Sequence, residues 1–313
     1  MRVGPASPST LPLWSPLGRY LVWRFRPAFA ARGVEPKIEL YDTTTKTLHS
    51  LPDLNNADVG STGVGVQIVR QGNTTVTDKL YDANHHPTSS GSATFSHLMS
   101  VAAAGHTQAI VETGTFSGDG KPATFWQLPA SGPPLKVGVV APLHFLGQDQ
   151  APAVNWVAST NDGTTTAIVT GLGQDGGCAN GQDVHLIDLV HHTDTVIALP
   201  LSRGDLLAPT FSPGGNVLGG ISADCGYEGN DKSNAFVELH GSTWKTVVVG
   251  ATVASRGPGG LLAVQLGTFH AKEYEPVPSQ DHPLEIRNAA GVKVSTLPSC
   301  WSVAWTQAAV PPA

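Results

Sequence analysis

The sequence predicts an all-β fold, a β-propeller of six four-stranded blades, with a seven-bladed ring as the alternative. Three observations lead to this prediction. A glycine turn followed by an apolar strand returns at intervals of 45, 42, 58, 52 and 45 residues. The average interval, about 48 residues, is the length of a four-stranded propeller blade. Charged residues make up only 13% of the chain, and its apolar residues fall in short β-branched runs or alternate with polar residues instead of following a helical period.

The composition indicates a folded, turn-rich protein. The 313 residues include 35 Gly and 24 Pro, and 40% are hydrophobic, which is enough for a substantial core. The net charge of -6 offers no general attraction for phosphate backbones, so no nucleic-acid partner is expected. No apolar run approaches the roughly 18 residues of a membrane-spanning helix, so no membrane span is expected in the chain.

Each repeat contains four expected strands. The turn glycines are Gly18, Gly63, Gly105, Gly163, Gly215 and Gly260. A strand precedes the glycine, as in residues 154–157, and a second strand follows it. A third and a fourth strand are separated by a short polar turn, as in residues 38–42 and 48–51 of blade one. The third strand often ends in an aspartate (Asp42, Asp82 and Asp188), whose short side chain suits it to accept backbone N–H bonds from that turn.

The residues around two of the glycines carry a recognisable motif. Trp14-Ser15-Pro16-Leu17-Gly18 and Phe211-Ser212-Pro213-Gly214-Gly215 have an aromatic residue, Ser-Pro and Gly before an apolar strand. The chain therefore resembles the WD-repeat-like propeller repeats of the TolB type, although both copies depart from the motif at its Asp position. The resemblance covers nearly the whole chain and implies a protein-binding or sensing scaffold.

One propeller domain is expected over residues 1–313. A further innermost strand is expected at residues 302–305, shortly before the end of the sequence. Either this strand pairs into the first blade and closes the ring, or a seventh blade is completed by sequence upstream of Met1. In the second case the chain is a truncated piece of a longer protein.

The long connections between middle strands define the expected binding face. They span residues 24–37, 171–183, 223–234 and 267–282, and in a propeller they emerge on the same face. The candidate binding residues on them are acidic or aromatic, with one histidine: Asp175, Asp183, Asp224, Tyr227, Glu228, Asp231, His270 and Tyr274. By contrast, the basic residues near the start of the chain are interpreted as a solvated loop, with an anion site as the alternative: Arg19, Arg24, Arg26, Arg32 and Lys37.

No metal or cofactor is expected at this face, with calcium as the alternative. Oxygen-rich loops that contain glycine can wrap calcium, but Asp175-Gly176-Gly177 and Asp183 do not have the spacing of a known calcium loop. The pairs His85-His86 and His191-His192 should lie in the outer hairpins of blades two and four, too far apart to share an ion. Residues 159–166 partly resemble the Asp-box of sialidases, a turn that is already explained as a blade hairpin.

The three cysteines suggest one disulfide. Cys178 and Cys225 fall in the middle connections of consecutive blades, on the expected binding face. A bridge between them would close a loop of about 48 residues and stabilise by roughly 4 kcal/mol in the chain-entropy model. Cys300 would be the odd thiol, and three reduced cysteines are the alternative. Together with the low lysine content, the bridge favours an extracytoplasmic location over a cytoplasmic one.

The sequence therefore predicts a non-enzymatic scaffold or sensor domain that binds a protein, peptide or glycan through its long-connection face. No Gly-x-Ser-x-Gly occurs in a strand-turn-helix context, and no catalytic constellation stands out, so we do not expect an enzyme. The alternative is a propeller hydrolase that acts on glycosides or lactones, if two of the carboxylates converge.

Overall fold

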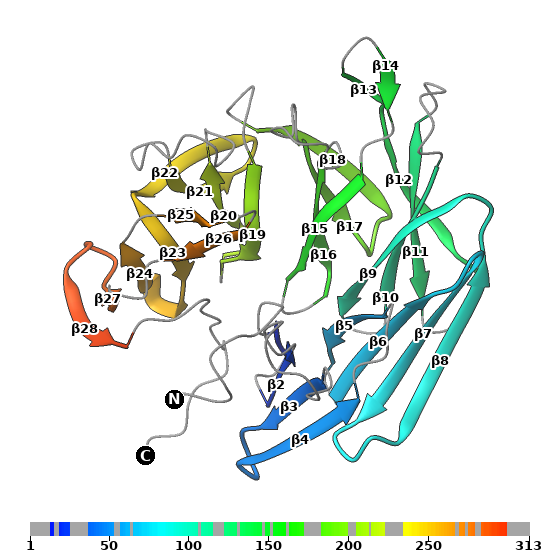
Figure 1. The fold of residues 1–313 in the computed structure, drawn as a ribbon, viewed down its shortest axis with the longest axis horizontal. Helices are drawn as coiled ribbons and strands as arrows, with labels where there is room; N and C mark the ends of the chain where they lie inside the picture. Colours follow the sequence, from blue (N-terminus) through cyan, green and yellow to red (C-terminus); the bar gives the residue numbers. More distant parts are fainter. Residues whose placement is uncertain are drawn as a thin grey trace.

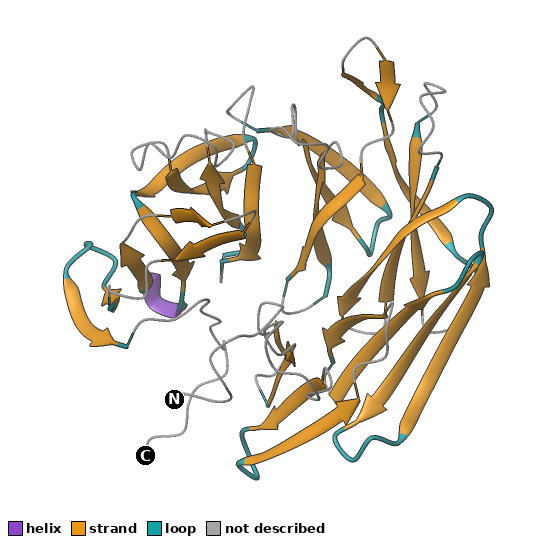
Figure 2. Cartoon of the chain, in the orientation of Figure 1, coloured by secondary structure: helices purple, strands orange, loops and turns teal. Residues whose placement is uncertain are grey.

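The computed structural model describes most of the strands and turns of the chain. The described residues are 13–15, 19–25, 37–52, 57–62, 65–105, 108–114, 122–129, 132–145, 148–150, 153–160, 163–171, 183–199, 205–212, 214–222, 234–266, 269–272, 275–278 and 283–298. Their only helical segment is a 3-10 turn, η1 (Pro258–Gly260) (Figure 2). Searched over these residues, the chain has no helix with the length and apolar character needed to cross a bilayer.

The first three blades are antiparallel sheets of four strands each. Blade one contains β1 (Leu13–Trp14), β2 (Tyr20–Phe25), β3 (Lys37–Asp42) and β4 (Thr47–Pro52). Blade two contains β5 (Ala57–Ser61), β6 (Gly65–Gln71), β7 (Thr75–Asp82) and β8 (Pro87–Thr94). Blade three contains β9 (Leu98–Gly105), β10 (Gln108–Thr113), β11 (Ala123–Pro129) and β12 (Leu135–Val140).

The second half of the chain repeats this arrangement. Blade four contains β15 (Ala153–Ser159), β16 (Thr165–Gly171), β17 (Asp183–Asp188) and β18 (Thr193–Ala198). Blade five contains β19 (Asp205–Phe211), β20 (Val217–Ser222), β21 (Asn234–His240) and β22 (Thr243–Val249). Blade six contains β23 (Ala251–Arg256), β24 (Leu262–Leu266), β27 (Leu284–Arg287) and β28 (Lys293–Leu297).

The blades follow one another around a central axis in chain order (Figure 1). The first strands of blades two to five are innermost, because β5 contacts β9, β9 contacts β15, and β15 contacts β19. This architecture confirms the predicted all-β propeller with six four-stranded blades. Residues 302–305, the expected closing strand, lie outside the described residues, so the mode of ring closure stays a prediction.

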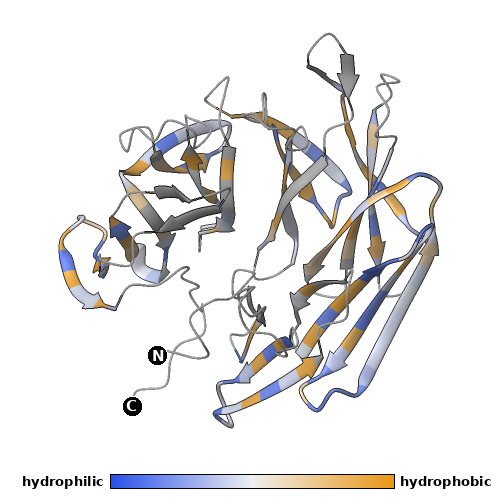
Figure 3. Ribbon diagram, viewed as in Figure 1, coloured by the Kyte–Doolittle hydropathy of each residue, from blue (hydrophilic) through white to orange (hydrophobic). Residues whose placement is uncertain are grey.

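Each pair of successive blades shares an apolar core. Side chains alternate along a strand, so one set of a blade's residues faces the preceding blade and the other set faces the following blade. Figure 3 shows the hydrophobic residues of the described strands in orange. Five apolar clusters lie between successive blades, from the pair of blades one and two to the pair of blades five and six. Each cluster contains buried side chains from both blades, for example, in the order of the blade pairs, Leu40 and Ile68; Val76 and Val111; Phe125 and Ile187; Val184 and Leu206; Phe236 and Val264. A sixth cluster, Leu21, Trp23 and Tyr41, lies on the face of blade one that is turned away from blade two.

A hydroxyl group closes the first hairpin of four blades. The side-chain oxygen of Ser15 accepts the backbone N–H of Tyr20 at 2.9 Å, and that of Ser212 accepts the N–H of Asn216 at 3.2 Å. Thr62 and Thr160 do the same for Gly65 and Thr165. The serine of the repeat motif therefore holds the turn before the second strand, and the Asp-box-like segment is a blade hairpin as predicted.

An aspartate closes the second hairpin of three blades, as predicted from the strand ends. One carboxylate oxygen of Asp42 accepts the N–H of Thr44 at 2.8 Å, and Asp82 and Asp188 accept two turn N–H groups each. Asn288 has the same role in blade six. In blade four, the hydrogen bonds from the side chain and backbone of His191 lower the pKa of Asp188 to about 2.

Two inserted hairpins are not anticipated by the sequence analysis. β13 (Leu143–Phe145) pairs with β14 (Gln148–Gln150) between blades three and four, and stands clear of the blades in Figure 1. This insertion accounts for the longest repeat interval. β25 (Phe269–Lys272) pairs with β26 (Glu275–Pro278) inside what the sequence analysis treats as one long connection. In each hairpin only two residues separate the strands, a spacing typical of tight turns.

Gly65 occupies a position with no room for a side chain. A Cβ atom built there would lie 2.2 Å from the carbonyl oxygen of Tyr81 and 2.8 Å from the carbonyl carbon of Asp82. Both contacts are with backbone, which cannot rotate away as a side chain can. We therefore expect Gly65→Ala to lower the free energy of unfolding by about 2 kcal/mol or more in chemical denaturation.

Gly214→Ala is the matched control. Its added methyl group would meet only the side chains of Ser212 and Asn216, at 3.8 and 3.9 Å. We expect its free energy of unfolding to stay within about 0.5 kcal/mol of the parent value. Equal stability of the two variants would contradict the close packing of β6 against the end of β7.

Candidate functional site

The two faces of the propeller differ in the length of their connections. The loop face carries the connections between the second and third strands of each blade, and the hairpin face carries the turns inside the blades. Four loop-face connections join β2 to β3, β16 to β17, β20 to β21 and β24 to β27, and each has at least eleven residues. On the hairpin face, the turns between the third and fourth strands have two to five residues.

Most candidate binding residues fall on loop-face connections outside the described residues. These are Asp175, Asp224, Tyr227, Glu228, Asp231 and Tyr274, and the cysteines Cys178, Cys225 and Cys300 are likewise outside. Their grouping into a site and the Cys178–Cys225 bridge therefore stay predictions. His270 lies on β25, opposite Val277 of β26, which places it in a hairpin rather than in an irregular loop.

Asp183 is the one candidate whose side chain is described. It begins β17 at the loop-face end of blade four and is partly exposed. Its backbone carbonyl accepts a hydrogen bond from the hydroxyl of Thr170 at 3.4 Å. Burial raises the pKa of the Asp183 carboxyl, and the nearby imidazole of His185 opposes this shift.

The two histidine pairs lie where the sequence analysis expects them, in the outer hairpins of blades two and four. His191 contacts Asp188, with Nδ1 2.7 Å from the carboxylate. His192 reaches the neighbouring blade, where its Nδ1 lies 2.9 Å from Oε1 of Gln127. His86 lies 3.4 Å from the carboxylate of Asp82. These contacts tie the histidines to turns and to blade packing.

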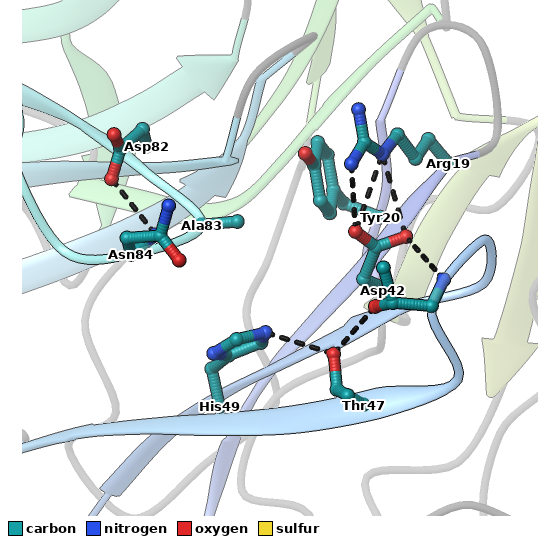
Figure 4. A pocket seen from close by; sticks show the side chains of 9 residues that line it. Arg19, Tyr20, Asp42, Thr47, His49, Asp82, Ala83 and Asn84 are labelled. Carbon is teal, nitrogen blue, oxygen red and sulfur yellow. Dashed lines mark hydrogen bonds and ion pairs between the residues drawn. The ribbon is translucent and has the colours of Figure 1, made fainter.

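A polar pocket opens on the hairpin face between blades one and two (Figure 4). Its volume is about 450 Å³, within the range of small-molecule sites. Blade one supplies most of the lining, and the turn between β7 and β8 supplies the opposite wall. The lining residues are Arg19, Tyr20, Asp42, Thr45, Thr47, His49, Asp82, Ala83 and Asn84.

An ion pair forms one side of the pocket. The guanidinium of Arg19 donates from Nη2 to the Asp42 carboxylate at 2.9 Å and from Nε at 3.3 Å. It also lies over the ring of Tyr20, 4.8 Å from the centroid. Burial alone would raise the pKa of Asp42, but hydrogen bonds from Arg19 and from the N–H groups of Thr44 and Thr45 hold that pKa below its ordinary value. Burial raises the pKa of the Tyr20 phenol, against the opposing charge of Arg19.

A row of hydrogen-bonding side chains forms the next side. The hydroxyls of Thr45 and Thr47 are 2.6 Å apart, and the Thr47 hydroxyl is 3.0 Å from Nε2 of His49. The His49 ring meets His85 edge to face, with centroids 6.1 Å apart. Burial, together with the nearby His49, lowers the pKa of His85.

The opposite wall is the turn that Asp82 organises. Oδ1 of Asp82 accepts the N–H groups of Asn84 and His86 at 2.8 and 2.9 Å. The backbone N–H of His86 is the main cause of the lowered pKa of this carboxyl. The Asn84 side chain is exposed, so its amide is accessible to a ligand.

Nothing in the sequence predicts this pocket, and Arg19, interpreted from the sequence as part of a solvated loop, forms one of its sides. The missed signal is the register of β2 and β3, in which Tyr20 pairs with Asp42. Arg19, the residue before Tyr20, therefore lies beside the aspartate at the end of the third strand. The second wall comes from another blade, which the sequence alone does not bring near.

The fold is similar to that of solved propellers. The β-propeller domain of the trilobed protease from Pyrococcus furiosus matches 88% of this chain and 78% of its own at 11% identity, with a TM-score of 0.53. The acylaminoacyl peptidase of Pyrococcus horikoshii matches 93% of this chain but 45% of its own at 10% identity, with a TM-score of 0.52. This chain thus spans less than half the length of that peptidase.

The similarity to a putative TolB from Agrobacterium tumefaciens is looser. It covers 95% of this chain and 85% of that protein at 14% identity, with a TM-score of 0.44. The TolB-type resemblance therefore rests on the repeat motif. No protein-family model matches the chain, and no curated protein matches it. At these identities the similar structures define the class of protein, a β-propeller, and leave its ligand open.

The Arg19–Asp42 pair gives a pH-dependent prediction. A carboxyl whose pKa is lowered in the folded state contributes stability above its ordinary value of 3.8 and loses that contribution as the pH falls through the lowered pKa. Arg19→Gln removes the guanidinium but keeps the turn N–H groups. We expect the variant to be less stable than the parent at pH 7, with the difference shrinking below pH 3.8 in denaturation series.

Lys79→Gln serves as the control, since Lys79 is an exposed cation on β7. It removes the same charge without touching Asp42, and we expect only a small stability change that varies little over this pH range. A constant stability difference between Arg19→Gln and the parent at all pH values would show that the carboxylate does not depend on Arg19.

Proposed function

We propose that the chain is a non-enzymatic binding scaffold, located outside the cytoplasm, that recognises a protein, peptide or glycan through its loop face. The observation that carries this proposal is the asymmetry between the two faces. The hairpin-face turns are short and fixed by hydrogen bonds from Ser, Thr, Asp and Asn side chains, whereas the loop face carries four long connections. Long connections on a rigid scaffold vary without disturbing the core, which suits them to recognition.

The positions of the two inserted hairpins also support the loop face as the binding surface. β13–β14 lies in the connection between blades three and four, and β25–β26 lies in the connection between β24 and β27. Connections between blades and connections between second and third strands emerge together on the loop face. Both insertions therefore enlarge the surface that we propose for binding and leave the hairpin face unchanged.

The charges of the loop-face connections favour a particular ligand chemistry. In blades four to six, carboxylates outnumber lysines, with Asp175, Asp183, Asp224, Glu228, Asp231, Glu273, Glu275 and Asp281 against Lys232 and Lys272. Carboxylates attract cationic side chains and accept hydrogen bonds from sugar hydroxyls. The proposed ligand is therefore a segment of protein or peptide that carries Lys or Arg, or a hydroxyl-rich glycan.

Selection from libraries tests the proposal without a known partner. A random-peptide phage library and a glycan array are applied to the purified chain and to the triple variant Asp224→Asn, Glu228→Gln, Asp231→Asn. We expect the parent chain to enrich ligands, and we expect the triple variant to bind them at least about tenfold more weakly, because several charge-assisted contacts are lost.

The matched control changes the net charge by the same amount elsewhere. Ser50→Lys, Ser90→Lys and Ser92→Lys lie on exposed outer-strand positions of blades one and two. This control should bind the selected ligands as the parent does. The proposal is wrong if neither library yields a ligand, or if the triple variant binds the selected ligands as tightly as the control does.

A further inference from the structure

We propose that the pocket between blades one and two binds a neutral, hydroxyl-rich small molecule of the size of a sugar. The pocket lies on the hairpin face, so this second site is independent of the proposed loop-face function. Nine described residues line it, and most of its polar side chains are held in place by hydrogen bonds within the blades.

The lining of the pocket combines apolar and polar groups, which suits an amphipathic small molecule. Tyr20 and Ala83 belong to or pack against the apolar cluster between blades one and two, and they supply the nonpolar part of the lining. Hydroxyl, imidazole, carboxylate, amide and guanidinium groups surround them. Small-molecule sites combine apolar lining with a few placed polar groups in this way, and sugars present C–H and O–H groups together.

The charge balance selects against strongly charged ligands. Asp42 is neutralised by Arg19, and its side chain is only 3% exposed. Asp82 remains as a second carboxylate, with its side chain 31% exposed. Because Arg19 is compensated by Asp42, it attracts an anion only weakly, and the Asp82 carboxylate repels one. Asp82 in turn already contacts Nδ1 of His86 at 3.4 Å. A neutral ligand needs neither charge.

The Thr45–Thr47–His49 row is suited to hydroxyl groups in particular. Each threonine hydroxyl can donate or accept, and a neutral imidazole donates from one nitrogen and accepts at the other. The hydrogen bonds along this row can therefore be donated from Thr45 toward His49 or from His49 toward Thr45. A ligand hydroxyl, which also donates and accepts, fits both directions, whereas a ligand with only donors or only acceptors fits one.

The remaining donors are already oriented. Arg19 uses Nε and Nη2 on Asp42, and a guanidinium has five N–H donors, so N–H groups remain for a ligand. The ion pair with Asp42 and the contact with the Tyr20 ring hold the guanidinium of Arg19 in place. Across the pocket, the Asp82 turn fixes the backbone of Asn84. Binding to groups that are already ordered avoids much of the entropy cost of immobilising side chains.

Titration of the isotope-labelled 313-residue chain with D-glucose, D-galactose, D-mannose and N-acetyl-D-glucosamine tests the proposal by NMR. We expect at least one sugar to bind saturably and to shift the amides of residues 45–49 and 82–84. Thr47→Val breaks the hydroxyl row and Asn84→Ala removes the amide, and each should weaken binding about five- to tenfold while the melting temperature stays close to that of the parent.

Thr193→Val is the matched control. Thr193 pairs with Asp188 in blade four as Thr47 pairs with Asp42 in blade one, but it lies outside the pocket. Sugar affinity should be unchanged in this variant. The proposal is overturned if none of the sugars binds up to tens of millimolar, if Thr47→Val and Asn84→Ala bind as the parent does, or if inorganic phosphate or spermidine binds more tightly than every sugar. None of these results depends on the loop-face carboxylates.

Discussion

Apolar packing between successive blades is the constraint on which the rest of the structure depends. A four-stranded sheet of this size buries too little surface on its own, and each repeat needs its neighbours to cover both faces. Five clusters meet this need, and each contains side chains from two consecutive blades. The blades must therefore stack face to face. Because consecutive strands are antiparallel, this stacking gathers the hairpin turns on one face of the ring and the long connections on the other.

Buried polar pairs add specificity to the pairing of strands within the blades. Between blades three and four, Nδ1 of His185 lies 2.8 Å from the carboxylate of Asp194, and a Cβ atom at Gly138 would lie 2.6 Å from that carboxylate. In blade two, Gln67 donates to Asp78 at 2.9 Å, and burial raises the pKa of Asp78 to about 6. Because an unpaired buried polar group is costly, each pair favours the pairing of the two strands that carry it, β17 with β18 and β6 with β7.

The sequence predicted the blades well because their signals are local. Turn glycines, β-branched runs and the aspartates at strand ends such as Asp42 and Asp188 each lie within a few residues of the element that they define. The hairpin β13–β14 escaped prediction because three-residue strands have too few residues for a periodic pattern. The pocket escaped because His49 and Asn84 come from different blades, and only the stacking of those blades brings them together.

Native-state hydrogen exchange of the amides in β2, β6, β10, β16, β20 and β24 tests the central claim most directly. Each of these strands is the second strand of its blade. If every blade depends on its neighbours, the slowest amides of all six strands exchange through openings of the same free energy, and that free energy equals the free energy of global unfolding. A blade whose amides exchange through a much smaller opening free energy, while both neighbouring blades stay protected, would contradict the account.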